Sequence, residues 1–389
     1  MIAIRQNNRL ETTSIYTNDF GGKVAADVHS FHKTIPVYQP TPLYNLKGLA
    51  NKLNIDKIWL KDESHRFGLK AFKVLGTSYA VAKLLSEMLG LNKDQLSFSA
   101  FQNPAIKNRI KEFTLVTATD GNHGRGVAWT AQQFGCKCVV YMPRGTTQAR
   151  LQNIQSHGAD ASIIDGNYDD AVLLAKTNSG KFEWILVQDS SWEGYTKIPL
   201  WIMQGYLTMM GEVKEQLEGE VPTHVFVQCG VGSLPAAILA YYVEKHKSAK
   251  PIFAVVEPGD AGCVYESFTS QKLSSLKNEM NTIMAGLACG TPSLLAWKIL
   301  NDHSDYFIKC SDDITIKGMQ ILGQQEFGDP KIISGESGAV TTGLIYYLLS
   351  NPRFKSYADK IGLDKNSKVL LISTEGDTDP GMYNKILAQ

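Results

Sequence analysis

Two lysines three residues apart, Lys70 and Lys73, lie in a stretch of aromatic, aliphatic and small residues, "ESHRFGLKAFKVLGTSYA" (63–80). An ammonium group is costly to bury without a partner. Each lysine therefore either extends its head group to solvent or is kept as a nucleophile. If residues 69–83 form a helix, the two lysines are neighbours on its surface. Lys73 follows Phe72 and precedes two aliphatic residues, so we expect burial to lower its pKa and make it a candidate Schiff-base lysine.

A small-residue turn separates an apolar run from a helical pattern in "HVFVQCGVGSLPAAILAYY" (224–242). Glycines let the backbone approach a ligand closely, and free N–H groups at a helix start attract phosphate. The turn lacks the lysine of a nucleotide-triphosphate loop, and no dinucleotide fingerprint with its acidic residue is present. Taken alone, the pattern fits a tight structural turn equally well. A loop for one phosphate together with a reactive lysine indicates pyridoxal 5'-phosphate (PLP) as the cofactor.

Acidic and amide side chains follow two further apolar runs. "TATDGNHGRG" places Asp120, Asn122 and His123 after one of them, and Asp189 in "VQDSSWEGY" follows the run at 184–188. Asp or Asn at such a place can simply cap a helix. Alternatively, Asp189 binds a substrate amine or transfers a proton, and the helix start at Asn122 binds a substrate carboxylate.

Short β-rich runs alternate with helical patterns through most of the chain, which predicts an α/β fold of two doubly wound domains. We expect a small α/β domain over 90–210, inserted between 1–89 and 211–389 of a large PLP-binding domain. In this class, ligands bind at the carboxyl ends of strands. The loops to examine are therefore 119–124, 230–234 and 374–379. The predicted strands lie at 113–119, 138–143, 224–230, 251–258 and 368–374.

The composition excludes several other classes of protein. The 389 residues carry a net charge of +1, so no electrostatic attraction to nucleic acid or to an anionic membrane is expected. No apolar run approaches a membrane span, and the start of the chain lacks the apolar core of a signal peptide. The six cysteines form no C-x-x-C pair and the eight histidines show no metal-ligand spacing. We therefore expect a cytoplasmic protein without a bound metal.

The motifs and their order resemble the tryptophan-synthase-β-like PLP enzymes of fold type II. Those that carry the resemblance are "TPL" (41–43), "WLKDES" (59–64), "AFK" (71–73), "DGNHG" (120–124), "GVGSL" (230–234) and "STEGD" (373–377). The longer stretches "TATDGNHGRGVAW", "QDSSWEGYTKIPLWIMQGY" and "ISGESGAVTTG" are similar to diaminopropionate ammonia-lyases.

The resemblance implies a role for each matching position. Lys73 would bind PLP covalently, Asn122 would hydrogen-bond the phenolic oxygen of PLP, and Ser373 or Thr374 would face its pyridine nitrogen. The phosphate would rest on the backbone N–H groups of Gly230, Val231, Gly232, Ser233 and Leu234.

The implied reaction is the α,β-elimination of 2,3-diaminopropionate, in both the D and L isomers, to pyruvate and two ammonia. Lys73 would take the α-proton from one face and Asp120 from the other, while Asp189 would serve the substrate amine. A homodimer that acts on a small amino acid is also implied. Two alternatives stay open: a serine or threonine dehydratase of the same fold, which usually has serine where Asp120 stands, and a non-catalytic sensor of a phosphorylated metabolite.

Overall fold

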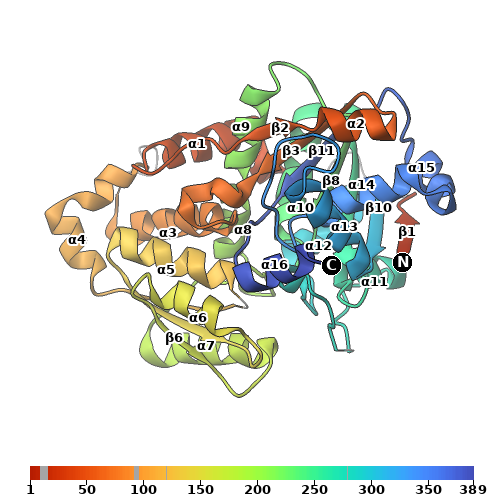
Figure 1. Cartoon of the computed structure of the whole chain (residues 1–389). Helices are drawn as coiled ribbons and strands as arrows, with labels where there is room; N and C mark the ends of the chain where they lie inside the picture. Colours follow the sequence, from red (N-terminus) through yellow and green to blue (C-terminus); the bar gives the residue numbers. More distant parts are fainter. Residues whose placement is uncertain (9–15, 92–95, 120, 278) are drawn as a thin grey trace.

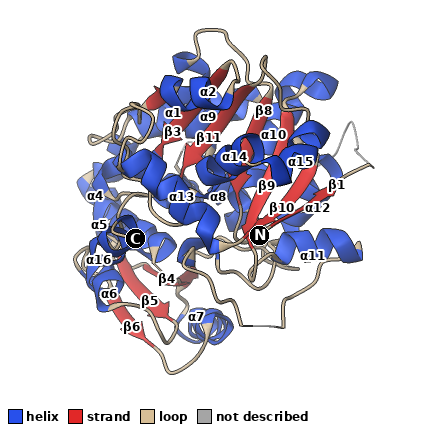
Figure 2. Cartoon of the chain, turned by 45° about the vertical axis from the view of Figure 1, so that its right-hand side comes forward, coloured by secondary structure: helices blue, strands red, loops and turns tan. Residues whose placement is uncertain are grey.

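The computed structural model describes residues 1–8, 16–91, 96–119, 121–277 and 279–389. Helices and strands alternate along the chain, and the strands form two separate sheets (Figure 1). Figure 2 shows the smaller sheet, with β4, β5 and β6, below the larger one. The predicted α/β fold with two sheets is confirmed.

The larger sheet has seven strands, and all neighbours are parallel except at its two edges, where β1 and β2 run antiparallel to the strands beside them. In spatial order the strands are β1 (Ile2–Gln6), β10 (Tyr306–Cys310), β9 (Ile252–Pro258), β8 (His224–Gln228), β11 (Lys368–Ser373), β3 (Lys57–Asp62) and β2 (Leu43–Asn45).

Helices cover both faces of this sheet, because successive side chains of a strand point to opposite sides. In β8, Val225 and Val227 pack into one apolar cluster and Phe226 into the other. One face is covered by α1 (Gly22–Lys33), α8 (Lys197–Gly205), α9 (Leu207–Gln216), α10 (Ser233–His246), α11 (Cys263–Ser270) and α12 (Leu294–His303). The other is covered by α2 (Lys47–Leu53), α13 (Asp312–Gly323), α14 (Val340–Ser350), α15 (Lys355–Ile361) and α16 (Pro380–Leu387).

The smaller sheet has four parallel strands, and all of them come from the predicted inserted range 90–210. Where each domain begins and ends stays a prediction. The strands are, in spatial order, β6 (Asp160–Ile163), β5 (Lys137–Met142), β4 (Thr114–Ala118) and β7 (Ile185–Leu186). The helices of this region are α4 (Pro104–Ile110), α5 (Asn122–Phe134), α6 (Gln148–Gln155) and α7 (Tyr168–Phe182).

Helix α3 (Lys73–Leu89) begins at Lys73, so the predicted helix over 69–83 is wrong in its first turn. The backbone of Lys70 has a φ of 55°, and the segment before Lys73 pairs with the chain beyond β11. The N–H of Gly376 donates to the carbonyl of Lys70, and that of Phe72 to the carbonyl of Thr374. This long-range pairing keeps Lys70 outside the helix, so the two lysines are not neighbours on a helical surface.

Helix α3 lies between α5 and α8, and its backbone touches that of α8. A Cβ on Gly205 would stand 2.4 Å from the carbonyl oxygen of Leu75, and a Cβ on Gly76 would stand 2.8 Å from that of Ile202. The two glycines therefore allow a helix contact without intervening side chains, which fixes the position of the helix that begins at Lys73.

Among the described residues, none of the helices is long and apolar enough to cross a membrane. The same residues contain no group of three or more His, Cys, Asp or Glu that could hold a metal ion. All six cysteines lie within the described residues and form no disulfide, so Cys263 and Cys289 are not paired with each other.

Candidate active site

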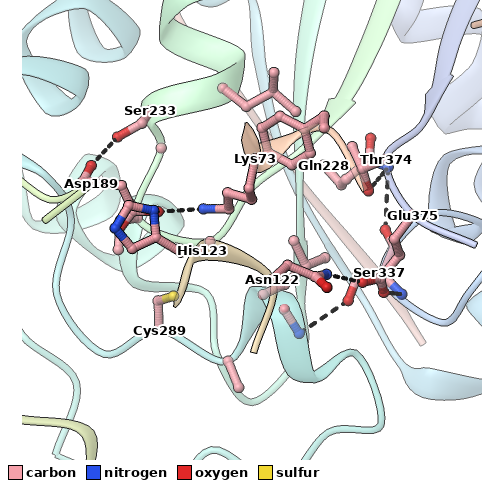
Figure 3. Close-up of a pocket in the computed structure, with 18 of the residues that line it drawn as sticks. Lys73, Asn122, His123, Asp189, Gln228, Ser233, Cys289, Ser337, Thr374 and Glu375 are labelled. Carbon is pink, nitrogen blue, oxygen red and sulfur yellow. Dashed lines mark hydrogen bonds and ion pairs between the residues drawn. The ribbon is translucent and has the colours of Figure 1, made fainter. Parts of the chain in front are cut away.

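A cavity lies where the carboxyl ends of β4, β8 and β11 meet, as expected for sheets of this class (Figure 3). Eight of the residues predicted from the sequence line it together: Lys73, Asn122, Asp189, Gly230, Val231, Gly232, Ser233 and Leu234. Thr374 lines it as well. Asp120, the remaining predicted catalytic residue, lies outside the described residues.

Lys73 forms an ion pair and a hydrogen bond with the carboxylate of Asp189, and its side chain is 19% exposed. Burial by itself lowers the pKa of Lys73, but the charge and hydrogen bond of Asp189, together with smaller contributions from Tyr206 and Cys289, outweigh it and raise the pKa above the usual lysine range. The expectation of a lowered pKa is therefore wrong in this structure, because Asp189 supplies the partner that an ammonium group needs.

Asp189 lies between two basic side chains. Nδ1 of His123 is 3.7 Å from the carboxylate, while Nε2 of the same ring is 2.8 Å from the carbonyl oxygen of Val187 and must donate its hydrogen there. Burial raises the pKa of Asp189, but the charges of His123 and Lys73 outweigh it and lower the pKa to about 2. The carboxylate is thus held ionised beside the amine that it pairs with.

The turn 230–234 joins β8 to α10 and presents its backbone to the cavity. Within the described part of the chain, none of its five backbone N–H groups donates to a protein acceptor. Gly232 has a φ of +99°, and a Cβ there would stand 3.0 Å from the Cβ of Ala296. Free donors at the start of a helix suit an anion such as a phosphate, and the left-handed backbone requires glycine.

Asn122 is the first residue of α5, but its side chain does not cap that helix. The hydroxyl of Thr119 accepts from the N–H groups of Gly121 and Gly124 instead. The Asn122 side chain turns into the cavity and donates to the carboxylate of Glu375 (Figure 3). The capping interpretation of Asn122 is therefore wrong.

The two hydroxyls at the end of β11 lie in different surroundings. Ser373 is fully buried and its Oγ donates to Oγ of Ser334 at 2.9 Å. Thr374 lines the cavity, and its Oγ1 accepts from Nε2 of Gln228 at 3.0 Å, which leaves the hydroxyl hydrogen to donate elsewhere. Of the two candidates for a cofactor nitrogen, Thr374 is the one that faces the cavity.

The polar side chains of the cavity that were not singled out from the sequence include Tyr168, Gln228, Ser337 and Glu375. Glu375 lies in the predicted ligand loop 374–379, so its position after a buried strand was the available signal. Gln228 is the last residue of β8, and its Oε1 is buried without a hydrogen-bond partner in the described structure. No local pattern distinguishes the other two.

The donor set fits PLP. A lysine opens into the cavity, unpaired N–H groups at a helix start suit the phosphate, and a hydroxyl and an amide can donate to the two ends of the ring. None of these groups must move out of a protein hydrogen bond except the Lys73 amine, which is paired with Asp189.

A family model described as "Pyridoxal-phosphate dependent enzyme" matches residues 35–355. The chain is 48% identical to a diaminopropionate ammonia-lyase of Salmonella typhimurium over 372 residues, which are 94% of this chain and 92% of that protein. A biosynthetic L-threonine dehydratase of Escherichia coli is 24% identical over 78% of this chain and 52% of that protein.

Among solved structures, the chain is similar to diaminopropionate ammonia lyase from Escherichia coli in complex with an aminoacrylate–PLP azomethine reaction intermediate. The TM-score is 0.92 at 43% sequence identity, and the match covers 100% of this chain and 97% of that one.

Proposed function

Because the chain belongs to the pyridoxal-phosphate dependent enzymes, and among them to the diaminopropionate ammonia-lyases, we propose that it eliminates ammonia from 2,3-diaminopropionate. The observation that carries this proposal is the 48% identity over nearly the full length of both chains. The identity to the threonine dehydratase is half as high, and the match covers only 52% of that enzyme, which disfavours the dehydratase alternative.

The reaction removes the α-proton, expels the β-amine as ammonia and releases aminoacrylate, which water hydrolyses to pyruvate and a second ammonia. PLP, when bound, supplies a ring that stabilises negative charge at the α-carbon. The chain itself supplies the groups that hold the cofactor and move protons.

We assign the holding groups from the cavity. Lys73 would bind PLP covalently, the N–H groups of 230–234 would bind its phosphate, and Asn122 would donate to its phenolic oxygen. Thr374, which faces the cavity, would donate to the pyridine nitrogen, in preference to the buried Ser373. A hydroxyl there leaves that nitrogen unprotonated.

The proton-moving groups are Lys73, Asp189 and Asp120. Lys73 would take the α-proton from one face of the substrate, and Asp120 would take it from the other, so that both isomers react. Asp189 is ionised beside Lys73, so it would bind the substrate ammonium or return a proton to the leaving amine.

The test is to follow pyruvate with D- and L-diaminopropionate, serine and threonine as separate substrates, and ketobutyrate with threonine. We expect turnover of both diaminopropionate isomers well above that of serine or threonine. A preference for threonine would favour the dehydratase. Borohydride reduction followed by mass mapping should place the cofactor on Lys73, whereas a sensor without a covalent cofactor would remain unmodified.

The two-base assignment is tested separately. Asp120→Asn should depress the reaction of the D isomer by ~10²–10⁴-fold and that of the L isomer less, because a placed base contributes about that much. Equal losses with both isomers would contradict the assignment of Asp120.

We also propose a homodimer that takes part in amino-acid catabolism, on the family resemblance alone, and a cytoplasmic location, on the cysteine pattern of the sequence. Sedimentation of the purified protein tests the dimer, since a monomer at micromolar concentration would rule it out.

A further inference from the structure

The carboxylate of Glu375 lies at the end of the cavity opposite Asp189 and holds two donors, one on each oxygen (Figure 3). Nδ2 of Asn122 donates to Oε2 at 2.5 Å, and the backbone N–H of Ser337 donates to Oε1 at 3.0 Å. The residue is only 4% exposed, so the geometry of these two bonds is set by the protein.

The chain holds Glu375 in place on both sides. Its backbone forms a bridge with Ala71, and its carbonyl oxygen accepts from the N–H of Gly335. Across the described ranges, no Lys, Arg or His lies within ion-pair distance of the carboxylate. Burying a carboxyl group whose hydrogen-bond partners are amides costs free energy, so its place in the cavity points to a role beyond stability.

A carboxylate can only accept hydrogen bonds, whereas a side-chain amide has a donor end and an acceptor end. The end of Asn122 that faces Glu375 must therefore be Nδ2. The described structure contains no other hydrogen bond of the Asn122 side chain, so its second N–H stays available to the cavity.

We propose that Glu375 is a positioning residue that fixes the orientation of the Asn122 amide, so that Asn122 presents an N–H to the phenolic oxygen of PLP. This inference rests on the proposed function and on the proposed role of Asn122.

Glutamine at position 375 should reverse that orientation. Its single carbonyl oxygen can serve only one of the two donors, and the backbone N–H of Ser337 cannot turn over. The glutamine oxygen therefore stays with Ser337, and its NH₂ group faces Asn122. Asn122 must then rotate its amide to offer Oδ1, which removes the donor from the phenolic oxygen.

The experiment measures PLP binding and the absorption spectrum of the lysine-bound cofactor in Glu375→Gln, Glu375→Asp and Asn122→Ala. We expect Glu375→Gln to weaken PLP binding about tenfold, the usual effect of one hydrogen bond to a charged oxygen, and to shift the absorption band. Glu375→Asp keeps an acceptor-only group and should recover part of both effects. Unchanged affinity and spectrum in Glu375→Gln would overturn the proposal.

The double variant distinguishes positioning from general damage. If Glu375 acts through Asn122, Glu375→Gln should cause little further loss in an Asn122→Ala background. Losses that simply add would overturn the inference.

The matched control is Glu257→Gln, which removes another buried carboxyl group that accepts from two backbone N–H groups, those of Val264 and Tyr265, and does not line the cavity. We expect it to leave both readouts unchanged, and an equal loss in this control would also overturn the inference. PLP binding is measured without substrate. The inference on Glu375 can therefore fail while the proposed reaction stands, and the proposed reaction can fail while the inference on Glu375 stands.

Discussion

Two lysines, Lys61 and Lys73, are both paired with a buried carboxylate, but only Lys73 lines the cavity. Lys61 uses all three donors of its ammonium group: it bonds a backbone carbonyl at 2.7 Å, Gln216 at 2.9 Å and Glu212 at 2.6 Å. Lys73 bonds Asp189 alone among the described residues.

The difference shows what separates a structural lysine from a candidate nucleophile. Glu212 also binds Arg66, which in turn binds Glu63, so two cations and two anions form a closed and fully buried network. Nothing in that network is left to bind a ligand. Burial is common to both lysines, whereas unused hydrogen-bonding capacity beside a cavity belongs to Lys73 only.

The largest effect should come from Lys73→Ala. We expect the absorption band of the lysine-bound cofactor to disappear and pyruvate formation to fall by ~10²–10⁴-fold or more, because the variant loses the proposed attachment point and a proposed proton-transfer group. Spectra and pyruvate assays of the purified variant provide the measurement. A variant that keeps the band and the turnover would mean that the two lysines were assigned the wrong way round.

Lys61→Met should leave the chemistry intact and damage the fold instead. Removing one cation from a buried network leaves Glu212 poorly compensated, so the free energy of unfolding should fall by about 3 kcal/mol. Urea unfolding measures this loss, and the cofactor band per folded molecule should match the unmodified protein. Loss of the band in folded protein would break the distinction between the two sites.

Acidification should weaken the ion pairs of two buried carboxylates, Glu212 and Asp189. Burial raises the pKa of Glu212, but Arg66 and Lys61 outweigh it and lower the pKa to about 2, as happens for Asp189. The ordinary pKa values of these carboxyl groups are 4.5 for Glu212 and 3.8 for Asp189. Above these values the two ionised carboxylates stabilise the folded protein in full. As the pH falls toward 2 this stabilisation is lost, because the carboxyl groups take up protons more readily in the unfolded chain than in the folded one. Each of the two carboxylates should account for roughly 2–3 kcal/mol of the lost free energy of unfolding.

Urea unfolding at pH 7 and pH 3 measures that slope. Asp189→Asn should show a smaller decrease in unfolding free energy than the unmodified protein. Identical slopes in the two proteins would contradict a depressed pKa at Asp189.

Lys70→Gln should have the smallest effect. The side chain is 43% exposed and pairs with Asp377, and exposed pairs contribute less than about 1 kcal/mol. Thermal unfolding and pyruvate assays should both stay close to the unmodified protein. A tenfold loss of turnover would show that Lys70 contributes to catalysis after all.

Much of this arrangement could be predicted from the sequence, because its signals are local. The alternation of strand and helix patterns predicted the α/β fold. Because ligands of such folds bind at the carboxyl ends of strands, the loops that line the cavity could also be predicted. The choice of Lys73 over Lys70 also followed from its apolar neighbours.

The parts that could not be predicted depend on distant segments. The pairing of Ala71 with Glu375 starts α3 at Lys73, and no pattern within 69–83 reveals it. Likewise, the pKa of Lys73 follows from Asp189, which is 116 residues away in the chain. Lys61 follows the apolar residues of 58–60 much as Lys73 follows Ala71 and Phe72, so an apolar stretch before a lysine does not by itself separate the two roles.

A single hydroxyl joins two of the regions described above: Oγ of Ser233, at the start of α10, donates to the backbone carbonyl of Asp189 at 2.7 Å. This hydrogen bond links the turn proposed to bind the cofactor phosphate to the segment that carries Asp189, whose carboxylate pairs with the Lys73 amine. Binding of the cofactor phosphate to this turn would therefore also help to hold Asp189 in its position beside Lys73.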